Sequence, residues 1–450
     1  QMQMFSDLNN LLNEIVWGPY MLALLVGTGV FLTLKLKFIQ VKDFRHAMKR
    51  TIGRAFEKGD LGEHEISSGQ AGLSSIAAVV GTGNIAGVAT AIAIGGPGAV
   101  FWMWFAAFFG MATKFAEITL GMKYRERKEA GYIGGPMYYI EKGIGQKWLA
   151  VFFAIMVIIA YFVIGAIVDT NTMVLSIEEQ WGINPVISGI FISLATAIVI
   201  FGGIKKIGEV CEKLTPIMGA VYIITGITVI ILNLGKVPEA FGLIFSNAFT
   251  PISATGGFAG ATLRQIITMG IARGLFSNEA GMGSSPMLHV SSNNDEPADE
   301  GLWGIAEVFF DTIIICTITA LTIVISGEWT TGVSGVALTM RAFTSTLNSN
   351  IGSHIVLVSA ILFGYSCLIT VNYYCELAGR YIFGDKCVMP IRVLWVIFIV
   401  IGAFGGLEFV WTLADTCNGL MAIPNLIALL FLSTEVKRLK DDYFSDVEKI

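Results

Sequence analysis

Long apolar stretches that are almost free of charge recur along the whole 450-residue chain. Apolar residues make up 54% of the sequence and charged residues only 14%, whereas soluble domains carry about 25% charged residues. A bilayer core about 30 Å thick is crossed by roughly 20 helical residues. The stretches are uniformly apolar and lack the short alternating pattern of a membrane β-barrel. The sequence therefore predicts an all-α integral membrane protein with several spans.

Polar breaks divide the chain into eleven predicted transmembrane helices. These lie at residues 17–35, 66–94, 98–122, 148–169, 186–203, 215–234, 262–288, 303–326, 353–380, 391–410 and 412–433. Cytoplasmic connections of membrane proteins collect basic residues, which sets the direction of the spans. Of the 29 Lys and Arg residues, 24 lie in the odd-numbered connections and the C-terminal tail, and only Lys236 and Arg341 lie in the even-numbered connections. We therefore expect the N-terminus outside and the C-terminus in the cytoplasm.

Two of the predicted spans carry polar interruptions that lipid cannot satisfy. The second span contains residues 78–87, with the sequence AVVGTGNIAG, and the seventh contains residues 273–281, with the sequence RGLFSNEAG. Both include the pattern Asn-x-Ala-Gly. Glycines in membrane helices also serve close helix packing. Paired interruptions at matching positions of two halves, however, indicate the binding site of a transporter.

The two interruptions lie five spans apart, and an odd offset reverses the direction of a helix across the membrane. Spans two to six and seven to eleven are therefore predicted to form two repeats of opposite topology. The predicted organisation is an N-terminal accessory helix with a basic cytoplasmic linker, a first repeat, an extracellular connection, a second repeat and a cytoplasmic tail. These parts cover residues 1–65, 66–234, 235–261, 262–433 and 434–450, respectively.

An interrupted helix offers backbone groups to a ligand. Unpaired N–H groups are left at the start of one half-helix, and unpaired C=O groups at the end of the other. The N–H end carries partial positive charge and suits a carboxylate, whereas the C=O end suits an ammonium group or a small cation. A zwitterion in the middle of the membrane would satisfy both kinds of end.

Two long stretches of the chain closely resemble the alanine or glycine:cation symporter family, also called sodium:alanine symporters. They are residues 81–125, GTGNIAGVATAIAIGGPGAVFWMWFAAFFGMATKFAEITLGMKYR, and residues 273–286, RGLFSNEAGMGSSP. The resemblance covers essentially the whole chain. It implies the leucine-transporter-like 5+5 inverted repeat and the import of small neutral amino acids, such as alanine and glycine, driven by sodium. It also implies a multi-pass protein of a prokaryotic plasma membrane that functions as a monomer.

The resemblance also implies which residues bind. The substrate carboxylate would lie on the first interruption, and its ammonium group and side chain would face the second. The implied substrate-binding residues are Gly81, Thr82, Gly83, Asn84, Gly274, Phe276, Ser277, Asn278 and Val371. The sodium ligands would be the carbonyl groups of Ala77 and Val80 and the hydroxyl groups of Ser366 and Thr370.

The ninth span departs from the family pattern. The family has Ser-Thr where this chain has Ser366-Cys367, and Gly-Trp where it has Thr370-Val371. A thiol is a poor ligand for a hard cation, which prefers oxygen. We therefore expect the sodium site to depend on Thr370 or to bind weakly, and Val371 to enlarge the cavity.

Several ionisable residues fall inside predicted spans, where such groups are functional candidates. Lys114 and Glu117 lie three residues apart and are expected to pair with each other. Glu307 and Asp311 lie four apart, on one helix face. Glu279, beside Asn278 and near Arg273, either holds the second interruption in place or accepts a proton. Glu279 and Arg273 are thus candidates for gating or coupling.

Three classes of function fit a chain of this kind to different degrees. A secondary symporter coupled to sodium fits best, and coupling to protons is the alternative. An ion channel fits less well, because channels are usually built from symmetric subunits around an axis. The sequence lacks a phosphate-binding Walker motif, and it has no G-x-S-x-G or H-E-x-x-H motif. We expect no enzymatic activity, no cofactor apart from co-transported sodium, and no nucleic-acid partner; the surrounding partner is the lipid bilayer.

Overall fold

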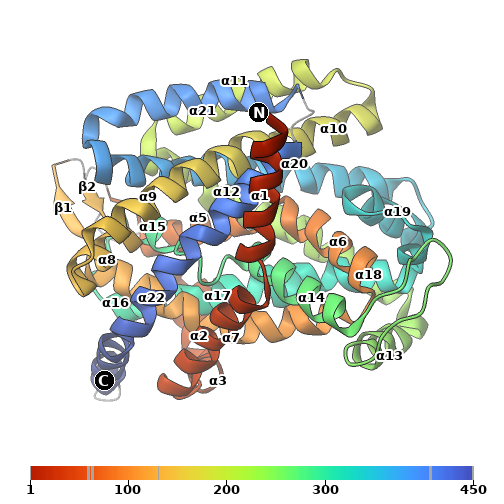
Figure 1. Ribbon diagram of the computed structural model, residues 1–450, viewed down its shortest axis with the longest axis horizontal. Helices are drawn as coiled ribbons and strands as arrows, with labels where there is room; N and C mark the ends of the chain where they lie inside the picture. Colours follow the sequence, from red (N-terminus) through yellow and green to blue (C-terminus); the bar gives the residue numbers. More distant parts are fainter. Residues whose placement is uncertain (1, 58–60, 62–64, 130, 405–407, 448–450) are drawn as a thin grey trace.

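The computed structural model describes residues 2–57, 61, 65–129, 131–404 and 408–447, and it is almost entirely helical (Figure 1). Within these residues, seven helical segments are long and apolar enough to cross a membrane. They are Asp7–Lys35, Ala99–Lys123, Lys147–Trp181, Gly203–Leu232, Pro297–Ser326, Ile351–Phe383 and Asp415–Val447. A bent pair, Ser68–Val79 with Thr82–Gly95, adds an eighth if the pair is one span. The protein is thus a multi-pass, all-helical membrane protein.

The N-terminal half of the chain contains the following elements. They are α1 Met2–Val16, α2 Pro19–Lys35, α3 Ile39–Lys42, α4 Phe44–Arg50, η1 Ile52–Arg54, α5 Ser68–Val79, η2 Thr82–Asn84, α6 Ala86–Gly95, α7 Ala99–Lys123, β1 Glu126–Lys128, β2 Gly131–Ile133, α8 Pro136–Ile144, α9 Lys147–Tyr161, η3 Phe162–Asp169, α10 Thr170–Trp181, α11 Pro185–Ile200 and α12 Gly203–Leu232.

The C-terminal half continues with η4 Leu234–Lys236, α13 Val237–Asn247, α14 Leu263–Asn278, α15 Pro286–His289, α16 Pro297–Gly301, α17 Trp303–Val308, η5 Phe309–Cys316, α18 Thr317–Ser326, η6 Glu328–Thr331, α19 Gly335–Leu347, α20 Ile351–Phe383, η7 Asp385–Cys387, α21 Val388–Gly402 and α22 Glu408–Val447. The segments η3 and η5 are π-helical turns inside longer helices.

Each of the eleven predicted spans contains a helix, but three of these helices are short and belong neither to the seven long segments nor to the bent pair. The helices α11, α14 and α21 have 16, 16 and 15 residues, below the roughly 20 needed to cross the bilayer core. Residues 405–407, at the end of the predicted tenth span, lie outside the described residues. The number of eleven spans therefore stays a prediction.

The structure also contains elements that the apolar pattern did not predict. The strands β1 and β2 form a small antiparallel hairpin in which Arg127 lies opposite Tyr132. Two helices, α13 and α19, occupy connections between spans. The hairpin and α8 lie at one end of the long axis of the molecule, and α13 and α19 lie at the other end (Figure 1).

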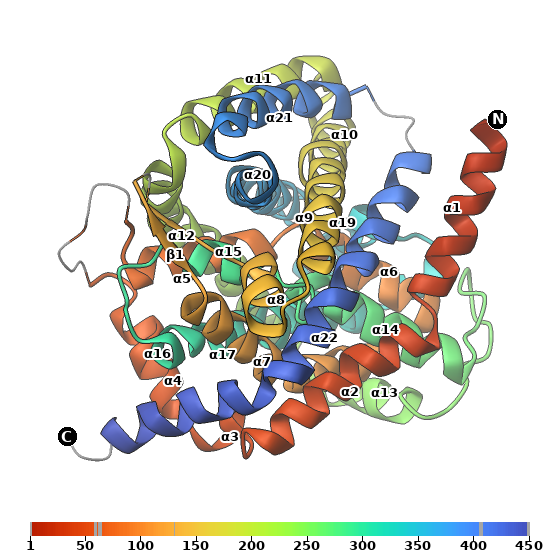
Figure 2. The same cartoon turned by 60° about the vertical axis from the view of Figure 1, so that its left-hand side comes forward.

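The long helices pack around the interrupted helix formed by α5 and α6. The helix α5 contacts α12 and α20, and α14 contacts α6 and α7. The helix α9 contacts α20 and α22. The helices α11 and α21 lie side by side at the edge of the molecule (Figure 2). Segments that are far apart in the sequence therefore surround the first interruption.

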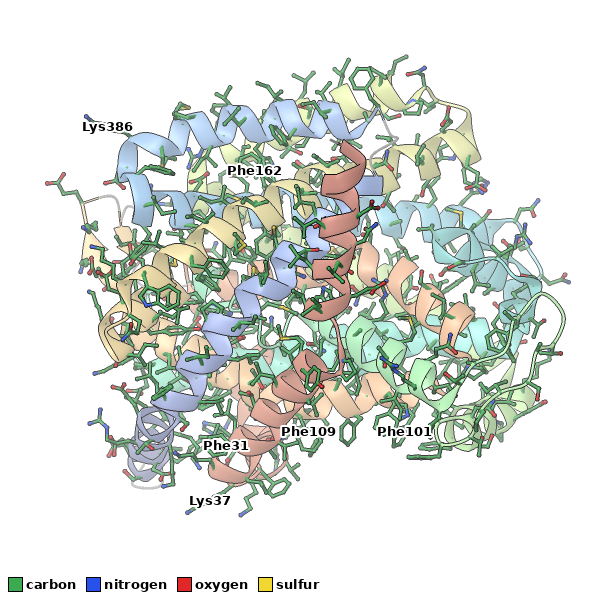
Figure 3. All side chains as sticks on the ribbon, in the orientation of Figure 1. Phe31, Lys37, Phe101, Phe109, Phe162 and Lys386 are labelled. Carbon is green, nitrogen blue, oxygen red and sulfur yellow. The ribbon has the colours of Figure 1, made fainter. Side chains whose placement is uncertain are left out.

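The outer surface of the helices is apolar. Large side chains such as those of Phe31, Phe191, Ile198, Ile224 and Phe431 are exposed by 41% to 75%, and Figure 3 shows the Phe31 side chain projecting from the bundle. An apolar surface of this extent marks contact with another apolar phase. In a multi-pass membrane protein, that phase is lipid.

Candidate functional site

The first predicted interruption is confirmed by the structure. The helix α5 begins with a capping box, in which Ser67 and Gln70 each accept a hydrogen bond from the other's backbone N–H (both 3.1 Å). The helix ends at Val79, and a single 3₁₀ turn separates it from α6, which is bent by 53° relative to α5. The backbone between Val80 and Ile85 thus departs from the hydrogen-bond pattern of a regular α-helix.

Asn84 holds this interruption in shape. Its Oδ1 atom accepts a hydrogen bond from the Gly81 N–H (2.8 Å), and its Nδ2 group donates one to Asp311 Oδ1 (2.6 Å). The Thr319 hydroxyl donates to the Asn84 carbonyl group (2.9 Å). The Asn84 side chain is fully buried. Its amide group therefore stabilises the conformation of the loop and links the loop to η5.

The second interruption begins later than the sequence suggested. Residues 273–278 are the last turns of α14, and the break starts at Glu279, which adopts a left-handed conformation with φ of 55°. Gly274 serves close packing instead, because a Cβ atom there would lie 3.1 Å from Met103 Cα on α7. The side chain of Asn278 ends the helix by accepting a hydrogen bond from the Ala280 N–H (3.0 Å). The break therefore lies at the C-terminal end of the predicted interruption 273–281, and its first six residues are still helical.

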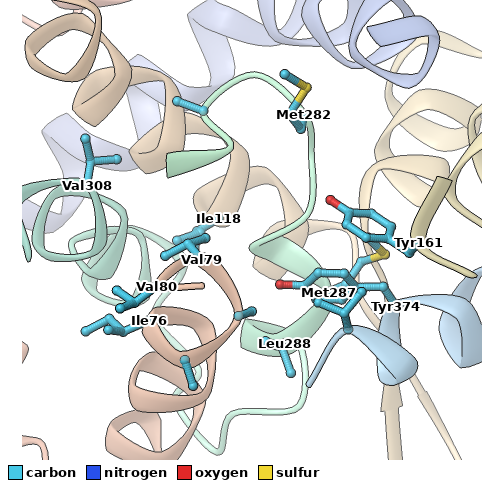
Figure 4. Close-up of a cluster of buried hydrophobic side chains, with 14 of the residues drawn as sticks. Ile76, Val79, Val80, Ile118, Tyr161, Met282, Met287, Leu288, Val308 and Tyr374 are labelled. Carbon is cyan, nitrogen blue, oxygen red and sulfur yellow. The ribbon is translucent and has the colours of Figure 1, made fainter. Parts of the chain in front are cut away.

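A cavity of about 40 Å³ lies between the two interruptions. A single water molecule needs roughly 10–15 Å³ on this measure, so the space suits a ligand of a few heavy atoms. Its lining comprises Ala78, Val79, Gly81, Thr82, Gly83, Tyr161, Ile164, Gly165, Asp169, Phe276, Ser277, Glu279, Cys367, Val371 and Asn418. The neighbouring apolar cluster includes Val79, Val80 and Tyr161 (Figure 4).

Six of the nine residues expected to bind substrate line this cavity: Gly81, Thr82, Gly83, Phe276, Ser277 and Val371. Gly274, Asn84 and Asn278 do not line it; Asn278 instead donates from its Nδ2 group to Thr312 Oγ1 (3.1 Å).

Two buried carboxylates hold the polar residues of the cavity in place. The Thr82 hydroxyl donates a hydrogen bond to Asp169 Oδ1 (2.7 Å), and the Ser277 hydroxyl donates one to Asp311 Oδ1 (3.1 Å). Asp169 and Asp311 belong to the π-helical turns η3 and η5, and such turns are frequent at functional sites.

The predicted sodium ligands are only partly brought together. The Ser366 hydroxyl donates to the Ala77 carbonyl group (2.8 Å), and the Cys367 thiol lies 3.1 Å from the Ala78 carbonyl oxygen. Thr370 instead donates to the Ser366 carbonyl group of its own helix (2.7 Å). Val80 lines a separate apolar cavity beside α12.

The expected ion pair between Lys114 and Glu117 was wrong. Lys114 Nζ lies 3.2 Å from Glu307 Oε2 and also donates to the Ser285 hydroxyl. Glu117 accepts hydrogen bonds from the Gly283 N–H (3.1 Å) and from Asn425 Nδ2 (2.6 Å). Both residues thus fix the segment after the second interruption, a role that sequence spacing alone does not reveal.

The guanidinium group of Arg273 lies over the Phe276 ring, 5.8 Å from its centroid. It does not line the cavity, whereas Glu279 does.

Sequence reasoning missed three polar residues of the cavity, Tyr161, Asp169 and Asn418. Asp169 ends the apolar stretch 148–169, and this carboxylate at the end of a predicted span was the available signal. Tyr161 and Asn418 resemble ordinary packing residues in the sequence, and no local pattern distinguishes them.

A solved structure of a Na⁺-coupled sialic acid symporter, in a substrate-bound outward-open state, is similar to this chain. The TM-score is 0.56 at 14% sequence identity, over 92% of this chain and 86% of that chain. The likeness shows a shared fold. Together with the long apolar helices, it defines the class as a multi-pass helical membrane protein.

Sequence comparison narrows the class to a family. The profile of the sodium:alanine symporter family matches residues 2–449. The sodium/alanine symporter AgcS of Methanococcus maripaludis is 43% identical over 438 residues, covering 95% of each chain. A probable sodium/glutamine symporter, GlnT of Bacillus subtilis, is 37% identical over 445 residues, covering 98% of this chain and 91% of the relative. The chain belongs to the sodium:alanine symporter family.

Proposed function

We propose that the protein is a symporter that imports small neutral amino acids, such as alanine and glycine, together with sodium. The observation that carries this proposal is the small cavity between two interrupted membrane helices, lined by backbone at Gly81 and Gly83. A volume of about 40 Å³ favours alanine or glycine over a substrate as long as glutamine.

In this proposal the backbone binds both ends of the zwitterion. The substrate carboxylate accepts hydrogen bonds from the N–H groups of Thr82 and Gly83, because the Gly81 N–H already donates to Asn84 Oδ1. The substrate ammonium group lies at the carbonyl end of α14, next to Phe276 and Ser277. A helix start favours a negative charge and a helix end favours a positive one. Phe276 and Val371 bound the substrate side chain, and Asn84 and Asn278 support the two backbone segments from outside the cavity.

Sodium is proposed to lie at the carbonyl end of α5. The carbonyl oxygens of Ala77 and Val80 and the Ser366 hydroxyl are oxygen ligands of the kind that hard cations prefer. The contact of 2.8 Å between Ser366 Oγ and the Ala77 carbonyl oxygen supports this position. Thr370, which bonds within its own helix, would have to rotate before it coordinates the ion.

The proposed transport cycle is alternating access between two inverted repeats, 66–234 and 262–433, flanked by the accessory segment 1–65, the connection 235–261 and the tail 434–450. The N-terminus is proposed to lie outside the plasma membrane and the C-terminus in the cytoplasm. Moving one positive charge inward is worth about 2.3 kcal/mol per 100 mV. A tenfold accumulation of substrate costs about 1.4 kcal/mol. At a membrane potential of about 100 mV, the entry of one sodium ion therefore provides enough free energy for a tenfold accumulation.

Uptake into proteoliposomes tests this function. Purified protein is reconstituted, and the uptake of labelled alanine and glycine is measured with an inward sodium gradient, and with potassium replacing sodium. The proposal predicts concentrative uptake only with sodium. Equal uptake under both conditions, or uptake driven only by a proton gradient, would contradict the proposed coupling to sodium.

Replacing the Ser366 hydroxyl tests the sodium position. Ser366→Ala removes one oxygen ligand, and we expect the sodium concentration for half-maximal uptake to rise about tenfold, because one hydrogen bond or ligand contributes about 1–1.5 kcal/mol. Ser359→Ala is the matched control, since it makes the same change in a buried serine of the same helix. An unchanged sodium dependence in Ser366→Ala would remove Ser366 from the site.

Replacing the Thr82 hydroxyl tests the arrangement of the first interruption. Thr82→Val keeps the shape of the side chain but leaves Asp169 Oδ1 without its donor. A stranded buried acceptor costs about 1–3 kcal/mol, so we expect the Kd for alanine to rise about 10- to 100-fold. The control Thr228→Val, at an exposed position where the hydroxyl bonds only its own helix, should bind normally. Normal binding by both variants would show that Thr82 has no such role.

A further inference from the structure

A second cavity, of about 290 Å³, lies between α5, α12 and η5. It shares no lining residue with the cavity between the two interruptions. Leu73, Ile76 and Val80 line it from α5, and Figure 4 shows Ile76 and Val80 next to each other at the end of this helix. A dry apolar cavity of about 150 Å³ already binds a molecule as large as benzene. The space between α5 and α12 is therefore large enough for a chain of several carbon atoms.

The lining of this cavity is apolar. Among the described residues that line it, Thr215 alone carries a hydroxyl, amide or charged group. The Thr215 hydroxyl already donates a hydrogen bond to the Leu73 carbonyl group (3.0 Å). The cavity thus offers no polar side-chain group that needs a partner, and its chemistry suits a hydrocarbon.

The cavity opens toward the apolar outer surface of the protein. Phe56 and Ala220 both line it and are both exposed, Phe56 by 62%. On the same helix as Ala220, the side chains of Ile217 and Ile224 are also exposed. The hydrocarbon that surrounds such a surface in a membrane is the acyl chain of a lipid.

A polar cavity of about 220 Å³ lies directly beside the apolar one. Arg54, Ser68 and Gly69 are among its lining residues, whereas Ala55 lines the apolar cavity. The two cavities meet where η1 touches the start of α5, because Gly69 packs so closely against the Ala55 carbonyl group that a Cβ atom has no room there. A molecule with a polar head and an apolar tail therefore fits across this contact.

The polar cavity holds one arginine that is able to bind an anion. Arg50 donates to both carboxylate oxygens of Asp299 (2.7 and 2.5 Å) and is neutralised by it. Arg54 Nε lies 3.3 Å from Glu57 Oε2, but both side chains are about half exposed or more, and such pairs are weak in water. The partial positive charge at the start of α5 adds to that of Arg54.

The surrounding segment is strongly basic. Residues 35–58 contain eight Lys and Arg residues and two acidic residues. Basic clusters next to a membrane helix attract the head groups of anionic lipids. The charge of this segment therefore favours an anionic head group over a zwitterionic one.

We propose that one anionic phospholipid binds at this place. Its phosphate group lies at Arg54 and the start of α5, and one acyl chain fills the apolar cavity as far as Val80. The lipid thus contacts the first interruption from outside the cavity between the two interruptions. Its binding does not depend on which solute the protein transports.

Photolabelling of the protein in phosphatidylcholine vesicles tests this site. Phosphatidylglycerol that carries a diazirine group near the end of one acyl chain is added, and the labelled peptides are identified by mass spectrometry after irradiation. We expect residues 73–80 to be labelled more strongly than residues 187–198 of α11, which include the exposed Phe191 and Ile198. Phosphatidylcholine with the same diazirine chain should label residues 73–80 about tenfold less, because it lacks the net negative charge that favours binding at an arginine.

Two substitutions test the two parts of the lipid separately. Arg54→Gln is expected to lower labelling by phosphatidylglycerol about tenfold, to the level of phosphatidylcholine. Arg438→Gln is the matched control, because Arg438 is also exposed and also lies near an acid three residues away, Glu435; it should keep full labelling. Ala220→Trp blocks the opening of the cavity and should abolish labelling of residues 73–80. Ala23→Trp, at an exposed position of α2, should leave it unchanged.

The wild-type protein alone decides between the outcomes, so the test holds even if a variant fails to fold. Labelling of residues 73–80 that is no stronger than that of residues 187–198 would overturn the lipid site. Equal labelling by the two lipids would overturn the assignment of an anionic head group. Neither result involves uptake, so a failure of the lipid site and a failure of the proposed function are distinguishable.

Discussion

Gly81→Ala is expected to lower sodium-driven alanine uptake about a hundredfold. A Cβ atom at residue 81 would lie 2.6 Å from Cys367 Sγ, which is shorter than a van der Waals contact. Either the Cys367 side chain turns away, which its packing against the Ala78 carbonyl group opposes, or the loop that begins the first interruption moves away from α20. The account assigns the substrate carboxylate to the N–H groups of this loop, and a displacement of about 1 Å at a reacting or binding centre costs roughly two orders of magnitude.

A second substitution distinguishes the effect of the contact with Cys367 from a general loss of folding. Cys367→Ala removes the obstructing sulfur atom, so the double variant Gly81→Ala/Cys367→Ala should regain most of the uptake of Cys367→Ala alone. Gly219→Ala is the control, because a Cβ atom there meets nothing within 4 Å. Normal uptake by Gly81→Ala, or a double variant as inactive as the single one, would contradict the proposed role of the loop.

Lys114→Met is expected to lower the free energy of unfolding by about 3–5 kcal/mol. The side chains of Lys114 and Glu307 are both fully buried, with 3.2 Å between Nζ and Oε2. Lys114→Met leaves Glu307 with only His289 Nε2 (2.6 Å) and the Ser285 hydroxyl (2.8 Å) as partners, and removing one member of a buried ion pair costs several kcal/mol. The measurement is unfolding by a denaturing detergent in mixed micelles.

An exposed ion pair provides the matched control. Lys206 Nζ lies 3.3 Å from Glu209 Oε2, and both side chains are about half exposed. Such pairs contribute about 0–1 kcal/mol, so Lys206→Met should unfold almost as the wild-type protein does. Equal effects of the two substitutions on the free energy of unfolding would show that the buried pair of Lys114 and Glu307 contributes no more to stability than the exposed pair.

The first interruption was predictable because its signal is local. Glycines at 81 and 83 weaken the helix, and Asn84 supplies a side chain that bonds back to the Gly81 N–H at a separation of three residues. The first part of the second predicted interruption, residues 273–278, is helical for an equally physical reason. Gly274 looks like a helix breaker in the sequence, but it lets α14 approach Met103 on α7. A sequence does not reveal which helix will pack against a glycine.

In the rest of the site, the sequence did not predict contacts between residues that lie far apart along the chain. Lys114 has an acid three residues away, yet it pairs with Glu307, which lies 193 residues along the chain. Likewise, Asp169 bonds to Thr82 across 87 residues. Such pairs depend on how the helices are arranged in space, and hydropathy predicts only that the helices exist. The six cavity residues that were predicted came from family resemblance, and the acid Asp169 had no counterpart in that argument.

The elements in the connections between the predicted spans escaped prediction for a different reason. The hairpin of β1 and β2 and the helices α13 and α19 lie in the connections between apolar runs, where the apolar pattern carries no information. The hairpin is stabilised by Arg125, whose guanidinium group lies 3.8 Å from the centroid of the Tyr132 ring. That contact joins residues on either side of the turn.

The most direct test of the account is a structure of the protein determined with alanine and sodium bound. The account predicts density for a zwitterion between the loop Gly81–Gly83 and the end of α14 at Phe276 and Ser277, and a separate ion at Ala77 and Ser366. An empty cavity, with alanine bound elsewhere or with residues 80–85 forming a continuous helix, would contradict it.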